Sequence, residues 1–552
     1  MRVGNTTIMI HLNGVIKAFT RNLLPRSILG SAKSSGKAFK YEDLIELNKS
    51  SERAAACSHL FEFQAGRFLN NDREERRKRA TRFDLKGLLK LLENKLDISQ
   101  SGIAIDTLEV LSEGKSKKLF KIVLKDQRSY VLRIPYSLGN EAHREFRLLS
   151  EAATMEFISQ VSFQLSFKFR AAIPLAYSRN ADNEIKTPYI LTSFIPGEKF
   201  AAMWKPEEID AEQKVTVIKQ IAEMQISVLK SKFPGYGSIY FANDLPTNIK
   251  SIKIDNRFAL GPSIERKFWM AQPNGSSKLW GPWSSWSEYL QATAGVQLEH
   301  AQSVSGEASA NFRVAERYAK IVSQLFTETE MQGQVASPRL YNPNLSPLNM
   351  VSQDDEALWL LEVEDSVVKP YVFHSVSAFA RNPYSESVND IINLPGSEEL
   401  PEPAKCSFRQ NYILTQLEAV YKYVLLNVSI PELVDAHHPN LMYRRDLVNQ
   451  GLSTDINTRS FVQFDYSMSQ LIEQWSMLRT GVKRPITYSD TEINHLVECI
   501  TQMSINSMCN KYIETNGFVP AGEFDELLKR GGLKVLDEKV GNFELTEEFL
   551  DS

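Results

Sequence analysis

The chain has 552 residues, a length at which two lobes with extensions are expected rather than one compact core. A hydrophobic fraction of 43%, a charged fraction of 24% and a net charge of −3 are typical of a globular protein and give no drive toward nucleic acid, so no nucleic-acid partner is expected. Four widely spaced cysteines without CxxC spacing exclude a disulfide framework or zinc motif, and no apolar run approaches 18 residues, so no transmembrane segment is expected.

Residues 1–41 differ from the rest of the chain because they contain no Asp or Glu but carry seven Lys and Arg residues. Apolar residues recur among these positive charges, so the segment can form a cationic amphipathic helix. This combination is typical of a mitochondrial transit peptide and predicts a mitochondrial localisation. A disordered basic tail is the alternative. A secretory signal fits less well, since polar residues interrupt the apolar stretch.

Residues 42–100 are predicted to form an N-terminal helical extension. Its segment 61–70, F-E-F-Q-A-G-R-F-L-N, is rich in aromatic residues that could pack on the surface of a lobe. The run 72–82 mixes basic residues with Glu74 and Glu75, which favours a solvated helix face with internal ion pairs over a phosphate-binding surface. Apolar residues at helical spacing predict a further helix over 83–96.

Residues 101–195 are predicted to form a small β-rich N-lobe. The elements expected there are, in order, strands over 107–111, 118–124 and 129–134, a helix over 141–160 and a strand over 189–195. A Pro-Gly pair at 196–197 ends the segment. Three strands, a helix, a strand and a hinge follow one another in the N-lobe of a kinase-like fold.

Residues 196–515 are predicted to form a large, mostly helical C-lobe, followed by a C-terminal segment, 516–552, with an acidic tail. Periodic apolar residues predict helices at about 209–230, 284–304, 310–329, 408–428, 461–480 and 487–513. From about residue 537 the chain is acidic and poor in aromatic residues, so its end is expected to fray. The predicted class is α+β, a bilobal protein-kinase-like fold.

Residues 341–350 read Y-N-P-N-L-S-P-L-N-M, and L-L-E-V-E follows at 360–364. This spacing matches the catalytic loop and metal segment of kinase-like phosphotransferases, H-x-D-x-x-x-x-N followed by a hydrophobic-hydrophobic-Asp segment. Asn342 stands at the His position, Asn344 at the position of the catalytic Asp, and Glu362 at that of the metal-binding Asp. Asn349 alone keeps the expected residue type.

The residue at position 344 decides whether proton transfer is possible. A carboxylate there orients the acceptor hydroxyl and takes its proton, whereas an amide has no basic lone pair for the second task. General-base assistance contributes roughly 10²–10⁴-fold in rate. Asn349 and Glu362 could still bind Mg²⁺, which prefers oxygen ligands. The alternative is that Pro and Asn in this segment form an ordinary turn between two helical blocks.

A nucleotide site would draw on the N-lobe. The turn 113–118, E-G-K-S-K-K, offers Gly114 for backbone approach to phosphate and Lys115 for charge, although an ordinary hairpin turn would look the same. Arg133, in the third strand, could hold phosphate, and Glu151, in the following helix, could hold Arg133. Both could equally stand on solvated faces.

Two other clusters are weaker candidates. His437 and His438 lack a third metal ligand at recognisable spacing, which favours a surface loop. The tryptophans Trp269, Trp280, Trp283 and Trp286 could stack on a ligand, but core packing is the more common role of Trp.

The order of several motifs resembles the altered inheritance of mitochondria protein 9 family, a fungal mitochondrial family within the aminoglycoside-phosphotransferase-like proteins. The motifs are F-E-F-Q-A-G-R-F-L-N (61–70), V-L-R-I-P (131–135), S-E-A-A-T-M-E-F (150–157), F-P-G-Y-G-S-I-Y (233–240), G-P (261–262), G-P-W-S-S-W-S-E-Y-L (281–290) and the loop 342–349. The resemblance implies a bilobal kinase-like fold, mitochondrial residence and a role in mitochondrial inheritance or maintenance. Relatives with intact loops carry the His and both Asp residues, from which this sequence departs at Asn342, Asn344 and Glu362.

The sequence therefore favours a pseudokinase that acts by binding a nucleotide or a protein partner and is not an enzyme. ATP and Mg²⁺ are the cofactors that such a site could hold. The second hypothesis is an atypical, low-rate ATP-dependent phosphotransferase acting on a small-molecule or protein hydroxyl. A scaffold that has lost nucleotide binding altogether is the third.

Overall fold

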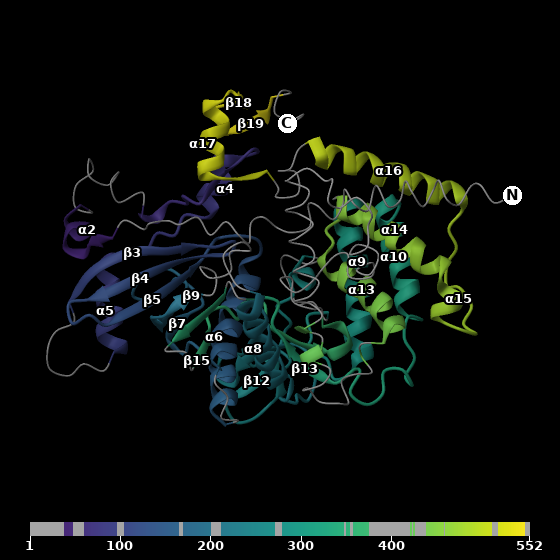
Figure 1. The fold of residues 1–552 in the computed structure, drawn as a ribbon, viewed down its shortest axis with the longest axis horizontal. Helices are drawn as coiled ribbons and strands as arrows, with labels where there is room; N and C mark the ends of the chain where they lie inside the picture. Colours follow the sequence, from purple (N-terminus) through teal and green to yellow (C-terminus); the bar gives the residue numbers. More distant parts are fainter. Residues whose placement is uncertain are drawn as a thin grey trace. The chain divides into compact units, whose positions relative to one another are not determined.

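The computed structural model describes residues 38–47, 60–96, 104–164, 169–199, 211–270, 279–346, 349–353, 357–374, 420–421, 423–425, 436, 438–456, 459–509 and 517–546 (Figure 1). Most of the predicted transit peptide lies outside these residues. The chain divides into two compact units, which we describe separately. Unit 1 comprises residues 1–148, 174–194 and 494–552, and unit 2 comprises residues 149–173 and 195–493. Each unit is therefore assembled from segments that are distant in sequence.

Unit 1 is built on a six-stranded sheet with the strand order β1-β3-β4-β5-β8-β7. Its strands are β1 (Phe39–Lys40), β3 (Ile105–Glu113), β4 (Lys117–Leu124), β5 (Ser129–Pro135), β7 (Pro174–Ser178) and β8 (Tyr189–Ser193). Every neighbouring pair in the sheet is antiparallel. The first eight residues of α6 (Glu141–Gln164) also belong to unit 1.

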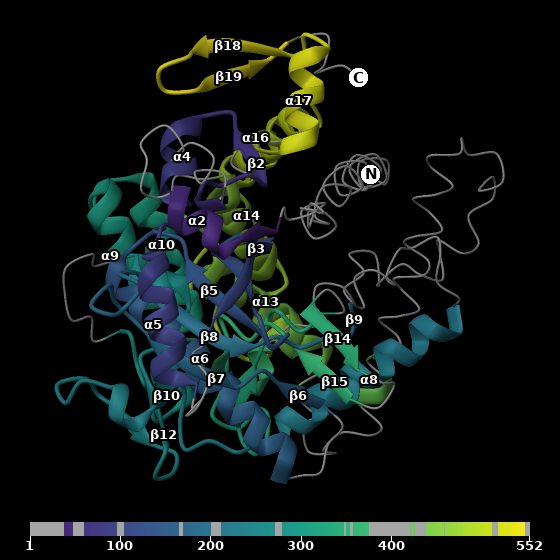
Figure 2. The same cartoon turned by 90° about the vertical axis from the view of Figure 1, so that its left-hand side faces the viewer.

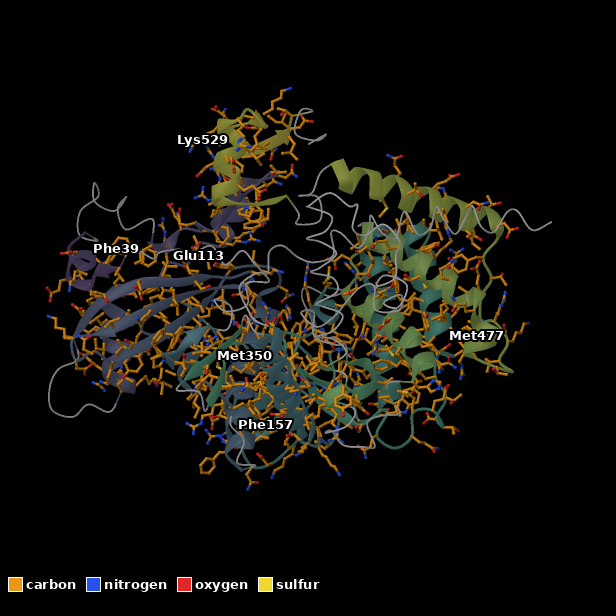
Figure 3. All side chains as sticks on the ribbon, viewed as in Figure 1. Phe39, Glu113, Phe157, Met350, Met477 and Lys529 are labelled. Carbon is orange, nitrogen blue, oxygen red and sulfur yellow. The ribbon has the colours of Figure 1, made fainter. Side chains whose placement is uncertain are left out.

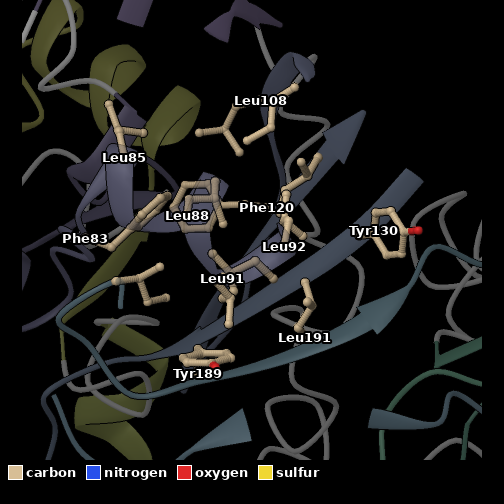
Figure 4. Close-up of a cluster of buried hydrophobic side chains, with 14 of the residues drawn as sticks. Phe83, Leu85, Leu88, Leu91, Leu92, Leu108, Phe120, Tyr130, Tyr189 and Leu191 are labelled. Atoms are coloured by element: carbon tan, nitrogen blue, oxygen red, sulfur yellow. The ribbon is translucent and has the colours of Figure 1, made fainter. Parts of the chain in front are cut away.

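Helices of the N-terminal extension cover this sheet. In α5 (Leu85–Lys95), Leu85, Leu88, Leu91 and Leu92 are buried and pack with sheet residues such as Phe120 and Leu191 (Figure 4). The Asp84 side chain accepts hydrogen bonds from two backbone N–H groups of the first turn and so caps the helix. The short helix α2 (Tyr41–Leu47) contributes Tyr41 and Leu44 to the same core.

The C-terminal segment joins the extension in unit 1. Strand β17 (Phe518–Pro520) pairs antiparallel with β2 (Gly66–Phe68), and β18 (Leu533–Asp537) and β19 (Asn542–Leu545) form a hairpin beside α17 (Ala521–Lys529) (Figure 2). The helix α4 (Asp72–Lys78) follows β2. The acidic segment is folded up to Leu545, because β19 pairs with β18 and Phe543 packs on Phe524, while the end of the chain that was expected to fray lies outside the described residues.

Unit 2 is mainly helical. Its helices are α8 (Ala211–Leu229), α9 (Trp286–Ser305), α10 (Ala310–Val322), α13 (Pro439–Ser453), α14 (Arg459–Glu473) and α15 (Trp475–Leu478). Helix α9 packs against α10 and α13, and α13 packs against α14. Helix α16 (Asp490–Cys509) begins in unit 2 and continues into unit 1. None of the described helices is both long and apolar enough to cross a membrane.

Short strands in unit 2 position the loop 342–349 and the segment 361–366. They form a three-stranded sheet, β10 (Ser238–Phe241), β12 (Phe258–Gly261) and β11 (Ile252–Lys253), a pair, β13 (Pro338–Tyr341) and β16 (Val367–Pro370), and a four-stranded sheet, β6 (Phe169–Ala171), β15 (Ala357–Leu360), β14 (Met350–Gln353) and β9 (Glu198–Lys199). The sequence did not predict these strands, because runs of two to four residues are too short to show alternation. The mixture of a β-rich unit and a helical unit confirms the α+β class.

Candidate functional site

Two strand pairs bring together the loop 342–349 and the segment 361–366. At one end, β13 pairs with β16 and sets Tyr341 opposite Val367. At the other end, β14 pairs with β15 and sets Met350 opposite Leu360 (Figure 3 labels Met350). The two intervening segments are therefore held side by side at both ends. The spacing in the sequence that matched a catalytic loop and a metal segment corresponds to a real juxtaposition within unit 2.

Three asparagine side chains, which we call the asparagine clasp (Asn342, Asn344 and Asn349), hold this arrangement: two link the segments, and the third bonds within the loop. The Nδ2 group of Asn342 donates to the carbonyl of Glu362 at 3.2 Å, and that of Asn344 donates to the carbonyl of Glu364 at 2.6 Å. The Nδ2 group of Asn349 donates to the carbonyl of Asn344 at 2.8 Å. The Oδ1 atom of Asn342 also accepts the backbone N–H of Asn344 at 2.8 Å, which fixes the orientation of its amide.

The clasp depends on side-chain N–H donors. An ionised aspartate offers only acceptors, so it could not make the bond from position 344 to the Glu364 carbonyl. The amide at the position of the catalytic base is thus used as a donor that holds the loop. Leu361 adds a backbone hydrogen bond to the carbonyl of Asn349 at 2.8 Å.

A group of three carboxylates lies beside the clasp. One oxygen from each of Glu151, Glu362 and Glu364 lies within 4.8 Å of those of the other two. Glu151 and Glu364 are 5% and 8% exposed, respectively. Like charges at this separation repel one another, and burial strengthens the repulsion. A hard divalent cation such as Mg²⁺ or Ca²⁺ takes oxygen ligands and would offset it, so the donor set fits such an ion.

Glu364 joins this group at a turn before β16, in which the backbone N–H of Ser366 donates to the carbonyl of Val363 at 3.2 Å. The turn leaves a carboxylate oxygen of Glu364 within 4.8 Å of one of Glu362. The backbone N–H of Glu364 donates to Oε1 of Glu362 at 3.0 Å. Asp365 then adopts a φ of 64°, a conformation that Asp tolerates, and the chain turns into β16. The alternating acidic residues Glu362 and Glu364 were the signal in the sequence for this group, but the metal ligands predicted from the sequence included only Glu362 of the two.

The predicted nucleotide-binding residues Gly114 and Lys115 lie in the turn between β3 and β4 in unit 1. The N–H of Gly114 donates to the carbonyl of Lys117 at 2.9 Å, which closes the turn. A Cβ atom at Gly114 would lie 3.3 Å from that carbonyl, so a larger residue would need the carbonyl to shift by a few tenths of an ångström. Lys115 is exposed.

The basic residue after the turn, Lys118, is fully buried and was not foreseen as important. Its Nζ atom lies 2.5 Å from Oε1 of Glu113 and donates to the carbonyl of Glu62 at 2.7 Å. Burial lowers the pKa of the Lys118 amine, while the Glu113 carboxylate acts in the opposite direction.

Arg133 lies on β5, and its side chain is buried in unit 1. Glu151 lies on the part of α6 that belongs to unit 2. The pair that the sequence predicts between them stays a prediction. Within unit 2, Glu151 instead has Glu362 and Glu364 as its described carboxylate neighbours.

The weaker candidates have structural roles where they are described. His438 caps α13 by accepting the backbone N–H of Asn440 at 3.3 Å, while the side chain of His437 lies outside the described residues. The rings of Trp269 and Trp280 stack at 4.0 Å in the interior, and Trp283 packs against Phe268. The basic run in α4 forms ion pairs along the helix, such as Arg79 with Glu75 at 2.6 Å.

No protein-family model matches the chain. Among solved structures, it is similar to the crystal structure of aminoglycoside phosphotransferase APH(4)-Ia, with a TM-score of 0.34 and 14% identity over 72% of this chain and 100% of that one. It is also similar to an ethanolamine kinase of Plasmodium vivax, with a TM-score of 0.30 and 12% identity over 69% of this chain and 85% of that one.

Curated relatives cover much more of the chain. Proteins called "Altered inheritance of mitochondria protein 9, mitochondrial" match from Yarrowia lipolytica (26% identity, 86% of each chain) and from Kluyveromyces lactis (25% identity, 87% of this chain and 90% of the relative). A third, from Candida albicans, is 26% identical over 90% of this chain and 89% of its own length. Their names agree with the expected mitochondrial localisation. The comparisons thus confirm the resemblance seen in the motifs: over most of its length, the chain is similar to the fungal mitochondrial proteins of that name.

Proposed function

We propose that the chain is a mitochondrial pseudokinase, a kinase-like protein that binds a nucleotide or a protein partner and transfers phosphate slowly or not at all. The observation that carries this proposal is the hydrogen bond from the Asn344 amide to the carbonyl of Glu364. The group at the position of the base is engaged as a donor and has no lone pair basic enough to remove a proton.

No residue within the loop supplies a substitute base, because 342–349 contains no acidic residue. The carboxylates of Glu362 and Glu364 lie together with Glu151, an arrangement that suits cation binding better than proton removal. Loss of a general base alone is expected to reduce the rate by about 10²–10⁴-fold.

The resemblance to relatives named for altered inheritance of mitochondria supports a role in mitochondrial inheritance or maintenance. A protein that binds without turnover would serve such a role by presenting a surface whose shape depends on its ligand.

A thermal-shift titration of the protein with ATP and Mg²⁺, alongside an assay of ADP release, tests this proposal. A ligand that binds only the folded state raises the melting temperature. We expect ATP with Mg²⁺ to raise it and ADP release to stay at the level of a blank. Release above the blank that disappears in Arg133→Ala would overturn the pseudokinase assignment. Arg179→Ala, which changes a partly exposed arginine immediately after β7, is the matched control.

The second candidate is an atypical, low-rate ATP-dependent phosphotransferase acting on a small-molecule or protein hydroxyl. The cluster of Glu151, Glu362 and Glu364 favours it, because positioning and electrostatic stabilisation carry most of phosphoryl transfer. Glu362 with Asn349 would hold Mg²⁺, which would neutralise charge on the phosphates. Arg133 would bind phosphate oxygens, and the substrate hydroxyl would lose its proton without help from position 344.

A further inference from the structure

The N-terminal extension lies against the turn between β3 and β4. The backbone N–H of Gln64 donates to Oε2 of Glu113 at 2.8 Å, and the amine of Lys118 donates to the carbonyl of Glu62 at 2.7 Å. Glu113 is the last residue of β3 and Lys118 the second residue of β4, so they flank the turn, and they form a buried ion pair. Residues about 50 positions earlier in the chain therefore hold both ends of the turn.

Aromatic residues surround these contacts in what we call the aromatic cap (Phe63, Phe68, Tyr136 and Phe518). Phe63 contacts Tyr136 edge to face, with ring centroids 5.9 Å apart, and Phe68 lies 5.4 Å from Phe518. The backbone N–H of Tyr136 donates to the carbonyl of Ser116, inside the turn, at 2.8 Å. The cap thus reaches the turn directly through Tyr136.

The C-terminal segment completes the cap. Strand β17 pairs with β2 and sets Phe518 opposite Phe68, 450 positions away in the sequence. The two strands approach so closely that a Cβ atom at Gly66 would overlap the ring of Phe518 and the carbonyl of Val519. Glycine at position 66 is therefore required for this pairing.

The two groups at the turn that could meet a phosphate, the amine of Lys118 and the N–H of Gly114, are already engaged by protein contacts. Lys118 is 0% exposed, and its amine contacts Glu113 and the Glu62 carbonyl. The N–H of Gly114 is used inside the turn, in the bond to Lys117. A turn held in this way presents neither the buried amine nor the glycine N–H to an anion.

We propose that the aromatic cap is an autoinhibitory contact: the C-terminal segment, through β17 and Phe518, keeps the β3–β4 turn closed and Lys118 buried. The inference rests on the proposed function in one respect, because what the cap would control is the proposed binding of a nucleotide. Release of β17 would free the turn and expose a cation able to bind the phosphates of a nucleotide.

Chemical labelling of the full-length protein tests the cap without any nucleotide. The probe is an amine-acylating reagent, and labelling of Lys118 is read by peptide mass spectrometry together with amide hydrogen exchange over 113–118. We expect Phe518→Ala to raise both rates about tenfold or more, which corresponds to about 1.4 kcal/mol in the opening equilibrium. Leu536→Ala, a change at an exposed position of the same C-terminal segment, should leave them unchanged.

Gly66→Ala is the second variant, since it disturbs the same strand pair from the side of the extension. Protected amides of β5 and of β4 beyond residue 118 show that the sheet of unit 1 remains folded in either variant. If Lys118 stays unreactive and the exchange over 113–118 stays slow in both variants, the cap proposal is wrong.

ATP binding to the same proteins then separates the cap from the proposed function. Autoinhibition predicts that Phe518→Ala binds ATP several-fold more tightly than the unchanged protein. Unchanged or weaker ATP binding together with a reactive Lys118 would show that the cap braces the turn, and would overturn autoinhibition. If none of the proteins binds ATP, the nucleotide function fails and autoinhibition fails with it, while the labelling still decides whether the cap closes the turn.

Discussion

The amide of Asn344 donates a hydrogen bond to the backbone carbonyl of Glu364 over 2.6 Å, joining the loop after β13 to the segment before β16. Aspartate at position 344 would place a carboxylate against that carbonyl oxygen, where two acceptors repel. The residue that a kinase would need for catalysis is thus incompatible with the way this loop is held.

Asn344→Asp is therefore expected to lower stability rather than create an active kinase. Loss of the bond and desolvation of an unpaired acceptor cost about 1–3 kcal/mol, measurable by chemical denaturation. The loss should shrink at acidic pH, since a protonated carboxyl can donate.

Asn180→Asp is the matched control, because Asn180 uses its Oδ1 atom to accept the N–H of Asp182, and a carboxylate can do the same. A variant Asn344→Asp that is as stable as the unchanged protein and releases ADP from ATP would contradict the clasp.

The carboxylates of Glu151, Glu362 and Glu364 predict stabilisation by a divalent cation. A cation at one hundred times its dissociation constant raises the free energy of unfolding by about 2.7 kcal/mol. Mg²⁺ or Ca²⁺ should therefore raise the melting temperature, and EDTA should reverse the effect. Glu364→Gln should weaken the response because it removes one charged ligand, while Glu328→Gln, at an exposed position, should preserve it.

The same variants are also measured without a divalent cation, so that the effect of the cation on each melting temperature is separated from the effect of the substitution itself. A melting temperature indifferent to millimolar divalent cations would instead mean that the cluster is held by protein contacts alone.

Elements with regular apolar periodicity were predicted well from the sequence. The helix expected over 83–96 corresponds to α5, and the helix expected over 284–304 corresponds to α9. Helix α13 was missed because two buried arginines, Arg444 and Arg445, occupy its inner face and break the apolar pattern. Arg444 is accommodated there by Glu330, at 2.8 Å, a partner 114 positions away that no local pattern reveals.

The candidate site was predictable only in part, because its contacts join segments that are separate in the sequence. Spacing alone indicated that Asn344 and Glu362 belong together, because it matches the catalytic loop and metal segment of kinase-like phosphotransferases. The direction of the hydrogen bonds was not predictable, because it depends on how two backbones face each other. The contact of Glu62 with Lys118 lay further beyond reach, since it joins the extension to a turn 56 positions later.

The buried pair Lys267 and His300 predicts a loss of stability in acid. The amine of Lys267 lies 3.1 Å from Nδ1 of His300 and donates to the carbonyl of Thr454. Burial, with Lys267 as a second cause, lowers the pKa of His300 from 6.5 to about 4. A histidine whose folded pKa is depressed contributes stability that is present above its unfolded pKa and is lost as the pH falls from about 6.5 to 4.

One pKa unit corresponds to about 1.4 kcal/mol, so a loss of about 1–3 kcal/mol over that range is expected. His300→Gln keeps an acceptor for Lys267 but cannot take up a proton, and its stability should vary less with pH. His495→Gln, which changes an exposed histidine on α16, should keep the full pH dependence. If the stability of the two variants depends equally on pH, His300 is not the source of the pH dependence.

Gly87 in α5 tests how closely the N-terminal extension packs against the rest of unit 1. A Cβ atom at Gly87 would overlap the backbone carbonyl of Glu184, so the helix can lie at its observed distance only with glycine there. Helix propensity alone would favour alanine by about 1 kcal/mol. The close approach should dominate, and Gly87→Ala should lower the free energy of unfolding by about 1–3 kcal/mol, as overpacking does.

Gly522 in α17 provides the comparison, since a Cβ atom there would meet nothing within 4 Å. Gly522→Ala should therefore leave stability unchanged or raise it by up to about 1 kcal/mol. Denaturant unfolding of the two variants measures both effects. Were Gly87→Ala to stabilise the protein as Gly522→Ala does, the extension would not pack against residue 184, and the buried leucines of α5 would need another partner.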